Sequence, residues 1–233
     1  MFLKKIIIKV KNFYFRRLEL LKIVNQFKNI GFKKKILIIA SSNSSLKLNK
    51  GPKVDKFDYI VRFNGAPTKN FENIIGSKTN MMCVSEKLFK KKCKLIDSKF
   101  LDELYLKDIF VVLEHSINND YNYSEIEKKN NIIFFPNYLN HYLRFLTFSK
   151  FNLFKKIYYF IYGKKMSIGL IMIKIFTFAG FKVHIFGFDL NKNKDNYTYY
   201  FNDRVKSLTK AHDWKQENKI ISRMLKNKEI FLL

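Results

Sequence analysis

One histidine near the C-terminus has the residue type and the setting of a general base. His212 stands five residues before Glu217, at the start of a segment whose apolar residues recur at helical spacing. An ordinary histidine titrates near pH 6.5 and can therefore accept a proton at neutral pH. His212 is the candidate catalytic base, although an ordinary polar residue at a helix start would look the same in sequence.

Two further segments contain polar groups that could bind an anion or a nucleotide. Ser167 and Gly169 begin an apolar segment, and a helix starting there would present free backbone N–H groups and the positive end of its dipole to a phosphate or carboxylate. Ser167 could equally be a plain helix cap. Asn64 follows a strand-like run, where its amide could bind a ribose or base edge or could cap its own turn.

A small polar loop at residues 41–45 follows the apolar run 36–40. It contains Ser42 and Asn43, and we expect it to face a nucleotide from the end of a buried strand. Because the loop is not rich in glycine, it matches neither a Walker motif nor a dinucleotide fingerprint.

The elements that must position these residues alternate between strand-like and helix-like patterns. Short apolar runs predict strands at 36–40, 59–63, 109–113, 132–135 and 183–188, and longer segments predict helices at 137–162 and 167–181. His184, within the last strand, is expected to be a packed core residue. The alternation predicts an α/β fold, a single Rossmann-like domain with a mostly parallel sheet flanked by helices. Ligands of such sheets collect at the carboxyl ends of the strands, near a topological switch point.

The N-terminal segment reads as a basic amphipathic helix over residues 1–32, ahead of a catalytic domain at 33–233. Residues 1–35 hold eleven Lys and Arg but one acid, Glu19, and no apolar run there is long enough to cross a bilayer. One apolar stripe runs through Leu3, Ile7, Val10, Tyr14, Leu18, Leu21 and Val24. The helix could lie on an anionic membrane surface, or it could pack on the domain with a solvated basic face.

The amino-acid composition limits which classes of ligand and partner we expect this protein to bind. The 233 residues carry a formal net charge of +26, which favours an anionic membrane, nucleic acid or a negatively charged substrate. Because the basic residues are spread along the whole chain, nucleic acid is not expected.

Cys83 and Cys93 form no CxxC pair, so we expect neither a disulfide framework nor a zinc site, and a reducing compartment, the cytoplasm, fits best. Asp189 lacks a second carboxylate at a spacing suited to a divalent metal, so neither metal nor cofactor is expected.

Four segments, in order over about residues 36–220, resemble the sialylmotifs of the animal-type sialyltransferases. The large motif is similar to Arg62-Phe63-Asn64-Gly65-Ala66-Pro67, followed by Phe71-Glu72 and Gly76-Ser77-Lys78-Thr79. The small motif is similar to residues 166–172 with 183–188, and the very small motif to residues 212–217. Two departures stand out: Ile168 replaces a hydroxyl residue, and Thr198, in Tyr197-Thr198-Tyr199-Tyr200, stands where the family's third motif has histidine.

The resemblance implies a GT-A-like sialyltransferase variant that moves sialic acid, or a related nonulosonic acid, from a CMP-sugar to a hydroxyl of a glycan or glycolipid, with inversion and without metal. It implies that His212 is the base and that Asn64 contacts the nucleotide, with Ser42 or Asn43 beside it. Tyr199 and Tyr200 could steady the leaving phosphate, as tyrosines do in a second, bacterial sialyltransferase family, or could form a packed aromatic patch. The alternatives are a non-catalytic basic protein that binds membranes or nucleic acid, and a sialyltransferase homologue that has lost activity.

Overall fold

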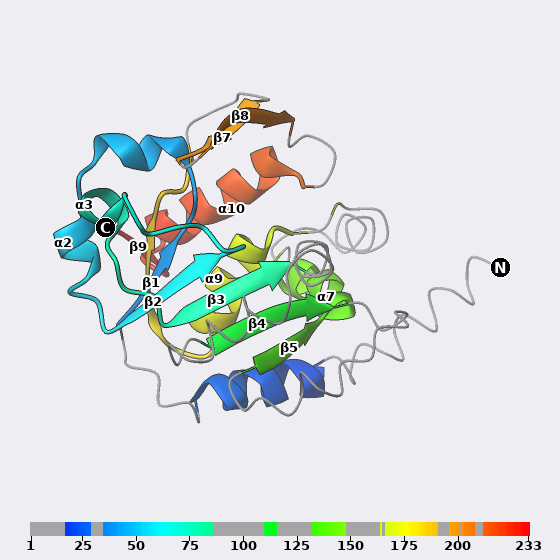
Figure 1. The fold of residues 1–233 in the computed structure, drawn as a ribbon. Helices are drawn as coiled ribbons and strands as arrows, with labels where there is room; N and C mark the ends of the chain where they lie inside the picture. The colour runs from blue at the N-terminus through cyan, green and yellow to red at the C-terminus, as the bar shows by residue number, and fades with distance from the viewer. Residues whose placement is uncertain are drawn as a thin grey trace, which may run out of the picture.

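A seven-stranded parallel sheet forms the centre of the computed structural model (Figure 1). The structure describes residues 17–28, 35–85, 110–115, 132–147, 164, 166–190, 196–200, 202–207 and 212–233. The strands are β1 (Lys35–Ile39), β2 (Tyr59–Phe63), β3 (Met81–Ser85), β4 (Phe110–His115), β5 (Ile132–Pro136), β6 (Lys182–Phe186) and β9 (Phe231–Leu232), in the order β5-β4-β3-β2-β1-β6-β9. All five predicted strands are present, and the predicted α/β fold with a parallel sheet is confirmed.

The order of the strands places a topological switch point between β1 and β6. The chain runs outward from β1 to β5 on one side and then returns to place β6 on the other side of β1. The loops that follow β1 and β6 leave the sheet in opposite directions at this point. Ligands of open parallel sheets bind in the crevice so formed.

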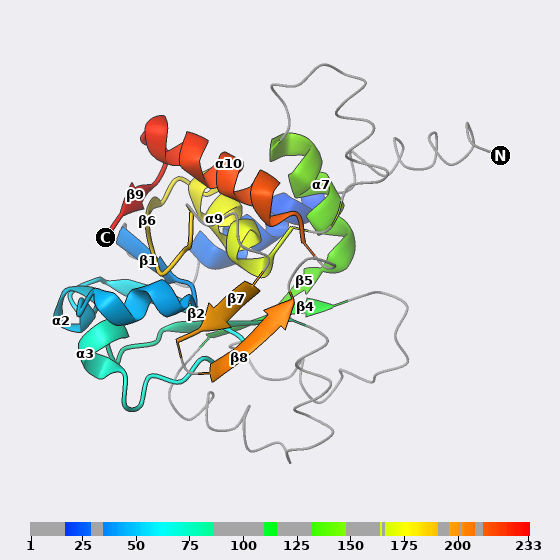
Figure 2. The same ribbon diagram turned by 90° about the horizontal axis from the view of Figure 1, so that it is seen from above.

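Two apolar cores cover the two faces of the sheet. Alternate side chains of β1 point to opposite faces, so that Ile36 and Ile38 enter one core and Leu37 and Ile39 the other. The first core is covered by α7 (Asn137–Thr147), α9 (Ile168–Phe178), α10 (Trp214–Lys226) and the helix at residues 17–28. Figure 2 shows α7, α9 and α10 grouped together. The second core lies beneath η1 (Asn43–Lys47), α2 (Gly51–Val54) and α3 (Glu72–Ile75).

The helix at residues 17–28 packs on the domain, which is one of the two alternatives expected for this segment. Leu20, Ile23, Val24 and Phe27 are buried, and the Phe27 ring lies 5.3 Å from that of Phe176 in α9. Among the described residues, this apolar row shares Val24 with the predicted stripe but not Leu21, which is partly exposed, or Leu18, which is 57% exposed. The sequence holds two adjacent apolar rows, and the one that carries Phe27 faces the core. Residues 1–16 lie outside the described residues.

The remaining elements surround the carboxyl ends of the central strands. β7 (Asn196–Tyr199) and β8 (Asn202–Ser207) form a separate antiparallel pair. The predicted helix 137–162 corresponds to α7 for its first eleven residues, and residues 148–163 lie outside the described residues. In the part of the chain that the structure describes, no helix has the length and apolar character required to cross a membrane.

Candidate active site

The loops after β1 and β6 are held together at the switch point. The Ala40 N–H donates to the Phe186 carbonyl at 2.8 Å, and the Ser42 N–H donates to the Gly187 carbonyl at 3.3 Å. Gly187 has a φ of 72°, and a Cβ at this position would lie 2.5 Å from the Ala40 carbonyl oxygen. Glycine is therefore required where the two loops approach, and the backbone hydrogen bonds hold the two loops against each other.

Ser42 and Asn43, the two residues nominated in the first loop, lie in different settings. Ser42 is buried; its hydroxyl lies 2.9 Å from that of Ser44 and accepts the Ser44 N–H at 3.2 Å, which caps η1. Asn43 begins η1 and is partly exposed. Of the two, Asn43 presents the more accessible side chain.

Asn64 stands at the carboxyl end of β2 with its side chain exposed. Its φ of 55° is in the left-handed region, which asparagine tolerates better than most residues, and its N–H donates to the Cys83 carbonyl at 2.8 Å. The backbone is thus fixed by the neighbouring strand, while the amide faces outward at the carboxyl edge of the sheet. This geometry accommodates both expected roles, turn formation and ligand binding.

Replacement of Asn64 separates these two roles. Asn64→Gly keeps the left-handed backbone accessible and removes the amide, so we expect roughly tenfold weaker CMP binding, the effect of one lost hydrogen bond, and a smaller loss of unfolding stability than in Asn64→Ala. Asn64→Ala should show the same loss of binding together with some loss of stability, because alanine disfavours a positive φ. Calorimetric CMP titration and thermal unfolding of both variants provide the measurement. If Asn64→Gly bound CMP as well as the unchanged chain does, the amide would have only a structural role.

Arg62 fixes the loop that precedes β3 against the end of β2. The buried guanidinium donates from Nη2 to the carbonyls of Ile75 at 2.8 Å, Gly76 at 3.1 Å and Lys78 at 3.0 Å, and from Nε to the Thr79 hydroxyl at 3.0 Å. Burial lowers the pKa of Arg62 to about 10, so the group stays charged at neutral pH. Arg62 is thus a structural residue of the large motif, a role that its apolar surroundings in sequence do not reveal.

Asp55 secures the same loop from its exposed side. Its carboxylate accepts the N–H groups of Ser77 and Lys78 at 3.0 Å and the Ser77 hydroxyl at 3.1 Å. Burial alone would raise the pKa of Asp55, but these hydrogen bonds outweigh it and the pKa is lowered. Asp55 and Arg62 together immobilise residues 75–79 and so support Asn64.

Tyr200 connects the loop after β1 with the loop after β2. Its N–H donates to the Ser41 carbonyl at 3.1 Å, its hydroxyl donates to the Pro67 carbonyl at 2.6 Å, and its ring makes an edge contact with Phe71. Burial raises its pKa to about 12, so the hydroxyl keeps its proton. Because that proton is shared with Pro67, the geometry matches the packed aromatic patch that was the alternative to a phosphate contact. Tyr199 belongs to β7, but its side chain lies outside the described residues, as does that of Thr198.

Ser167 and Gly169 form the start of α9, as predicted. The Ser167 hydroxyl accepts the Leu170 N–H at 3.3 Å and so caps the helix. A Cβ on Gly169 would lie 3.3 Å from the Phe188 ring, so glycine lets the segment after β6 pack against this helix. Ile168, which replaces the family's hydroxyl residue, packs against the main core. The start of α9 is thus fixed by its own cap and by the segment after β6.

Glu217 joins the start of α10 to the start of α9. Its carboxylate accepts the Ser167 N–H at 2.7 Å and the Ser167 hydroxyl at 2.5 Å, and its side chain is only 4% exposed. Burial raises the pKa of Glu217 to about 7, even though the hydrogen bonds from Ser167 act to lower it. Sequence reasoning assigned Glu217 no role of its own. A signal was present, because Glu217 lies in the buried row of α10 with Ile220, Ile221 and Met224.

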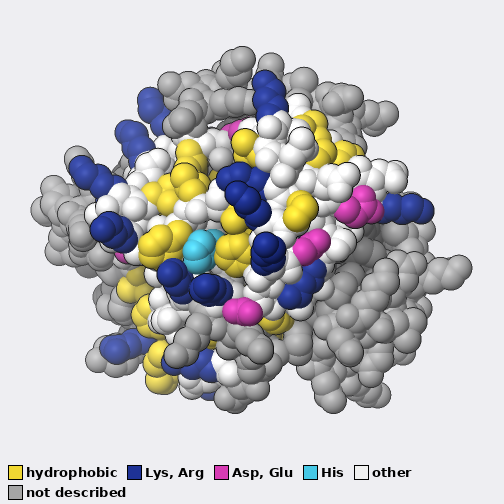
Figure 3. Space-filling view, turned by 90° about the vertical axis from the view of Figure 1, so that its left-hand side faces the viewer, with side chains coloured by type: hydrophobic (Ala, Val, Ile, Leu, Met, Phe, Trp, Pro, Cys, Tyr) yellow, Lys and Arg dark blue, Asp and Glu magenta, His cyan; other side chains and the backbone are white. Residues whose placement is uncertain are grey.

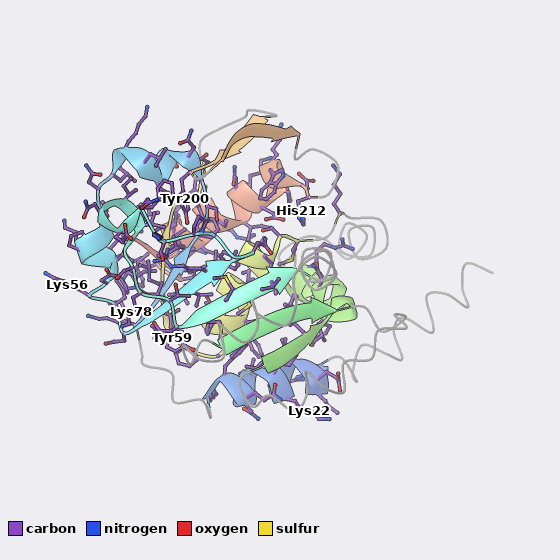
Figure 4. All side chains as sticks on the ribbon, viewed as in Figure 1. Lys22, Lys56, Tyr59, Lys78, Tyr200 and His212 are labelled. Atoms are coloured by element: carbon purple, nitrogen blue, oxygen red, sulfur yellow. The ribbon has the colours of Figure 1, made fainter. Side chains whose placement is uncertain are left out.

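His212 lies two residues before α10, next to the helix cap. Asp213 caps α10 by accepting the Gln216 N–H at 3.1 Å, and the His212 ring makes an edge contact with Trp214. Figure 4 shows His212 at the start of α10, with Tyr200 toward α3. Since the first turn of α10 is bound to Ser167, His212 and the start of α9 belong to one corner of the molecule. His184, in contrast, lies between the rings of Phe57 and Phe231 and is only partly buried, so it packs against aromatic rings without belonging to either core.

Metal coordination finds no support in the part of the chain described above. Among those residues, no three His, Cys, Asp or Glu side chains lie close enough together to hold a metal ion. Asp189, the acid that follows β6, contributes its carbonyl to a hydrogen bond from Asn218 at 3.2 Å. The described residues of this corner include hydrogen-bond donors, a histidine and a buried carboxyl group.

Sequence comparison extends the similarity beyond the motifs. A model of glycosyltransferase family 29 (sialyltransferase) matches residues 15–229. Beta-galactoside alpha-2,6-sialyltransferase 1 of Mus musculus is 29% identical over 104 residues, which cover 40% of this chain, and the Homo sapiens protein is 32% identical over 96 residues, which cover 36%. The matches span about a quarter of the length of these relatives, 25% and 23%.

Solved structures agree with the fold. Two crystal structures of a mammalian sialyltransferase, one of them in complex with Gal-beta-1-3GalNAc-ortho-nitrophenol, superpose with TM-scores of 0.56 and 0.54 at 17% and 16% identity. Each superposition covers 86% of this chain and 68% or 69% of the solved chain. The order of the motif residues, their position at the switch point and the match over residues 15–229 agree: the chain belongs to glycosyltransferase family 29, the sialyltransferases.

Proposed function

We propose that this chain transfers sialic acid, or a related nonulosonic acid, from a CMP-sugar to a hydroxyl group of a glycan or glycolipid. The observation that carries the proposal is the pair of hydrogen bonds between Glu217 and Ser167, because it brings the candidate base and the candidate anion site into one corner. Family membership supports the donor and the reaction type. Incubation with CMP-sialic acid and glycan acceptors tests the proposal: acceptor-dependent release of CMP supports it, and its absence contradicts it.

In the proposed mechanism His212 takes the proton of the acceptor hydroxyl as that oxygen attacks the anomeric carbon. CMP departs from the opposite face, so the sugar inverts, and no metal takes part. Asn64 and the loop that contains Asn43 hold the nucleotide. Ser167 and the N–H groups at the start of α9, including that of Gly169, stabilise the phosphate or the sugar carboxylate. Tyr200 acts by fixing Pro67, while Tyr199 stays a candidate for contact with the leaving group.

We also propose that the protein is cytoplasmic and touches an anionic membrane surface through its N-terminal residues. Five basic residues lie within residues 1–16. Lysines and arginines also outnumber acids on a separate face, the side of α2 and α3 that Figure 3 shows. Because Phe27 and its neighbours are buried in the core, the helix at residues 17–28 can offer a membrane only its exposed side, and the proposal rests mainly on the basic sequence of residues 1–16.

Removal of residues 1–16 should therefore weaken binding to anionic vesicles. Each basic residue near an anionic surface contributes about 1 kcal/mol at low salt, so the full chain should bind more tightly than the truncated one, and added salt should reduce the difference. Co-sedimentation with anionic vesicles, with neutral vesicles as the control, provides the measurement. Equal partitioning of the two chains at low salt would contradict the membrane proposal.

A further inference from the structure

Both polar hydrogen atoms of Ser167 already take part in hydrogen bonds to Glu217. Its hydroxyl has one hydrogen, which is donated to the Glu217 carboxylate at 2.5 Å, and its oxygen accepts the Leu170 N–H at 3.3 Å. Its backbone N–H is donated to the other carboxylate oxygen at 2.7 Å. While Glu217 is ionised, Ser167 has no hydrogen left to donate to an anionic ligand, and a buried negative charge lies next to the place that the ligand would take.

Protonation of Glu217 reverses the direction of this hydrogen bond. The carboxyl group then carries an O–H that can donate to the Ser167 oxygen, while its other oxygen still accepts the Ser167 N–H. The serine oxygen has two lone pairs, which suffice for Glu217 and for Leu170. The serine hydrogen is then free to point to a phosphate or carboxylate oxygen, and the buried charge is gone.

We propose that binding of the anionic donor at the start of α9 is coupled to the uptake of one proton by Glu217, which reverses the hydrogen bond to Ser167 and lets the serine donate to the ligand. The inference rests on the proposed function, since it takes the donor's phosphate or carboxylate as the ligand of Ser167. The proton comes from solvent and returns to it when the product leaves. Glu217 is thus a positioning residue that acts through Ser167.

The electrostatic setting of Glu217 favours this exchange. Burial holds the pKa of its carboxyl near 7, and the neighbouring Asp213 contributes to the raised pKa. The two helices that Glu217 joins also carry Lys174 on α9 and Lys215, Lys219, Arg223 and Lys226 on α10. His212 precedes α10, Asp189 accepts a hydrogen bond from Asn218 of α10, and Arg144 donates to the carbonyl of Lys164, which precedes α9, at 2.6 Å. An anion bound at Ser167 would add a second negative charge and raise the pKa further, so a proton would be taken up at a pH where the free enzyme is ionised.

Calorimetric titration tests the coupling. CMP-sialic acid and CMP are titrated at pH 8 in two buffers that differ in ionisation enthalpy, which gives the number of protons taken up per ligand bound. We expect a value approaching one for the full chain and a Kd that rises toward tenfold per pH unit above pH 7.5. Uptake with both ligands assigns the phosphate to Ser167, whereas uptake with CMP-sialic acid alone assigns the sugar carboxylate.

Glu217→Gln is the matched control. The amide oxygen can accept the Ser167 N–H and the amide NH₂ can donate to the serine oxygen, so the variant imitates the protonated state at every pH. It should bind with no Glu217-dependent proton uptake and with a flatter dependence of Kd on pH. Both proteins are titrated in the same buffers, so proton exchange that does not involve Glu217 is accounted for by the value measured with the variant.

The outcomes separate this inference from the proposed function. Binding of CMP-sialic acid to the full chain without proton uptake, or equal uptake in Glu217→Gln, would overturn the coupling and leave the proposed function intact. Failure of both ligands to bind at any pH would contradict the proposed function and the coupling together. Because the proton count of the full chain can overturn the coupling by itself, the test does not depend on the variant folding.

Discussion

Replacement of His212 by alanine is expected to lower turnover by roughly 10² to 10⁴-fold, the usual contribution of a positioned general base. The affinity for CMP should stay close to that of the unchanged chain, because His212 is assigned to the acceptor proton and Asn64 to the nucleotide. Initial rates of sialyl transfer and calorimetric CMP binding, measured on the same preparations, check both statements.

The pH dependence of turnover adds a second signature of His212. A histidine must be neutral to accept a proton, so the rate should fall on the acid side, and His212→Ala should lose this limb in its residual activity. The rate should also fall on the basic side, where Glu217 is ionised, and Glu217→Gln should lose that limb instead. Because His212 contacts Trp214, an unchanged melting temperature is the control for the histidine variant. Near-normal turnover of folded His212→Ala would end the assignment and direct attention to Tyr199.

Replacement of Arg62 by methionine is expected to give the largest loss of stability. The carbonyls of Ile75, Gly76 and Lys78 would lose a buried donor, and each buried acceptor left unsatisfied costs about 1–3 kcal/mol. We expect a total loss of roughly 3–5 kcal/mol in the free energy of unfolding, together with weaker CMP binding, because the end of β2 that carries Asn64 loses its support. Urea unfolding monitored by circular dichroism gives the stability.

Two further variants provide reference values for the loss of stability in Arg62→Met. Arg62→Lys keeps the charge but lacks the planar set of donors, so it should fall between the unchanged chain and Arg62→Met. Lys53→Met replaces an exposed lysine of α2 and should change the stability by less than about 0.5 kcal/mol. A loss below 1 kcal/mol in Arg62→Met would show that the loop at residues 75–79 does not depend on the guanidinium.

The sequence predicted the strands whose residues are β-branched and apolar, and it missed four others, the antiparallel pair β7 and β8 and two strands of the central sheet. β3 reads Met81-Met82-Cys83-Val84-Ser85, which lacks a marked β-branched pattern, and β9 has only two residues. Both strands exist because a neighbouring strand pairs with them, β2 and β4 with β3, and β6 with β9. The helix at residues 17–28 has two similar apolar rows. Only its packing against the core determines which row is buried, so the sequence alone could not select the buried face.

The candidate site was likewise only partly predictable from the sequence. Residue type and spacing nominated His212, Asn64, Ser167 and Gly169, because each follows a strand or begins a helix. The roles of Arg62 and Glu217 depend on partners distant in sequence: loop carbonyls thirteen to sixteen positions away for Arg62, and a serine fifty positions away for Glu217. Local patterns carry no information on such pairings, so a buried charge in a strand or helix is visible in sequence but its partner is not.

Acceptor-dependent transfer from CMP-sialic acid tests the proposed activity itself. The purified full chain is incubated with CMP-sialic acid and a panel of glycan acceptors, with excess chelator in a parallel reaction, and both released CMP and the sialylated product are measured. We expect equal amounts of CMP and product, an inverted anomeric configuration, the same rate with chelator, and a rate lowered at least about 10²-fold in His212→Ala. If the folded chain bound CMP but formed no product with any acceptor, it would be a homologue that has lost activity. A rate abolished by chelator and restored by magnesium or manganese would contradict the proposed mechanism.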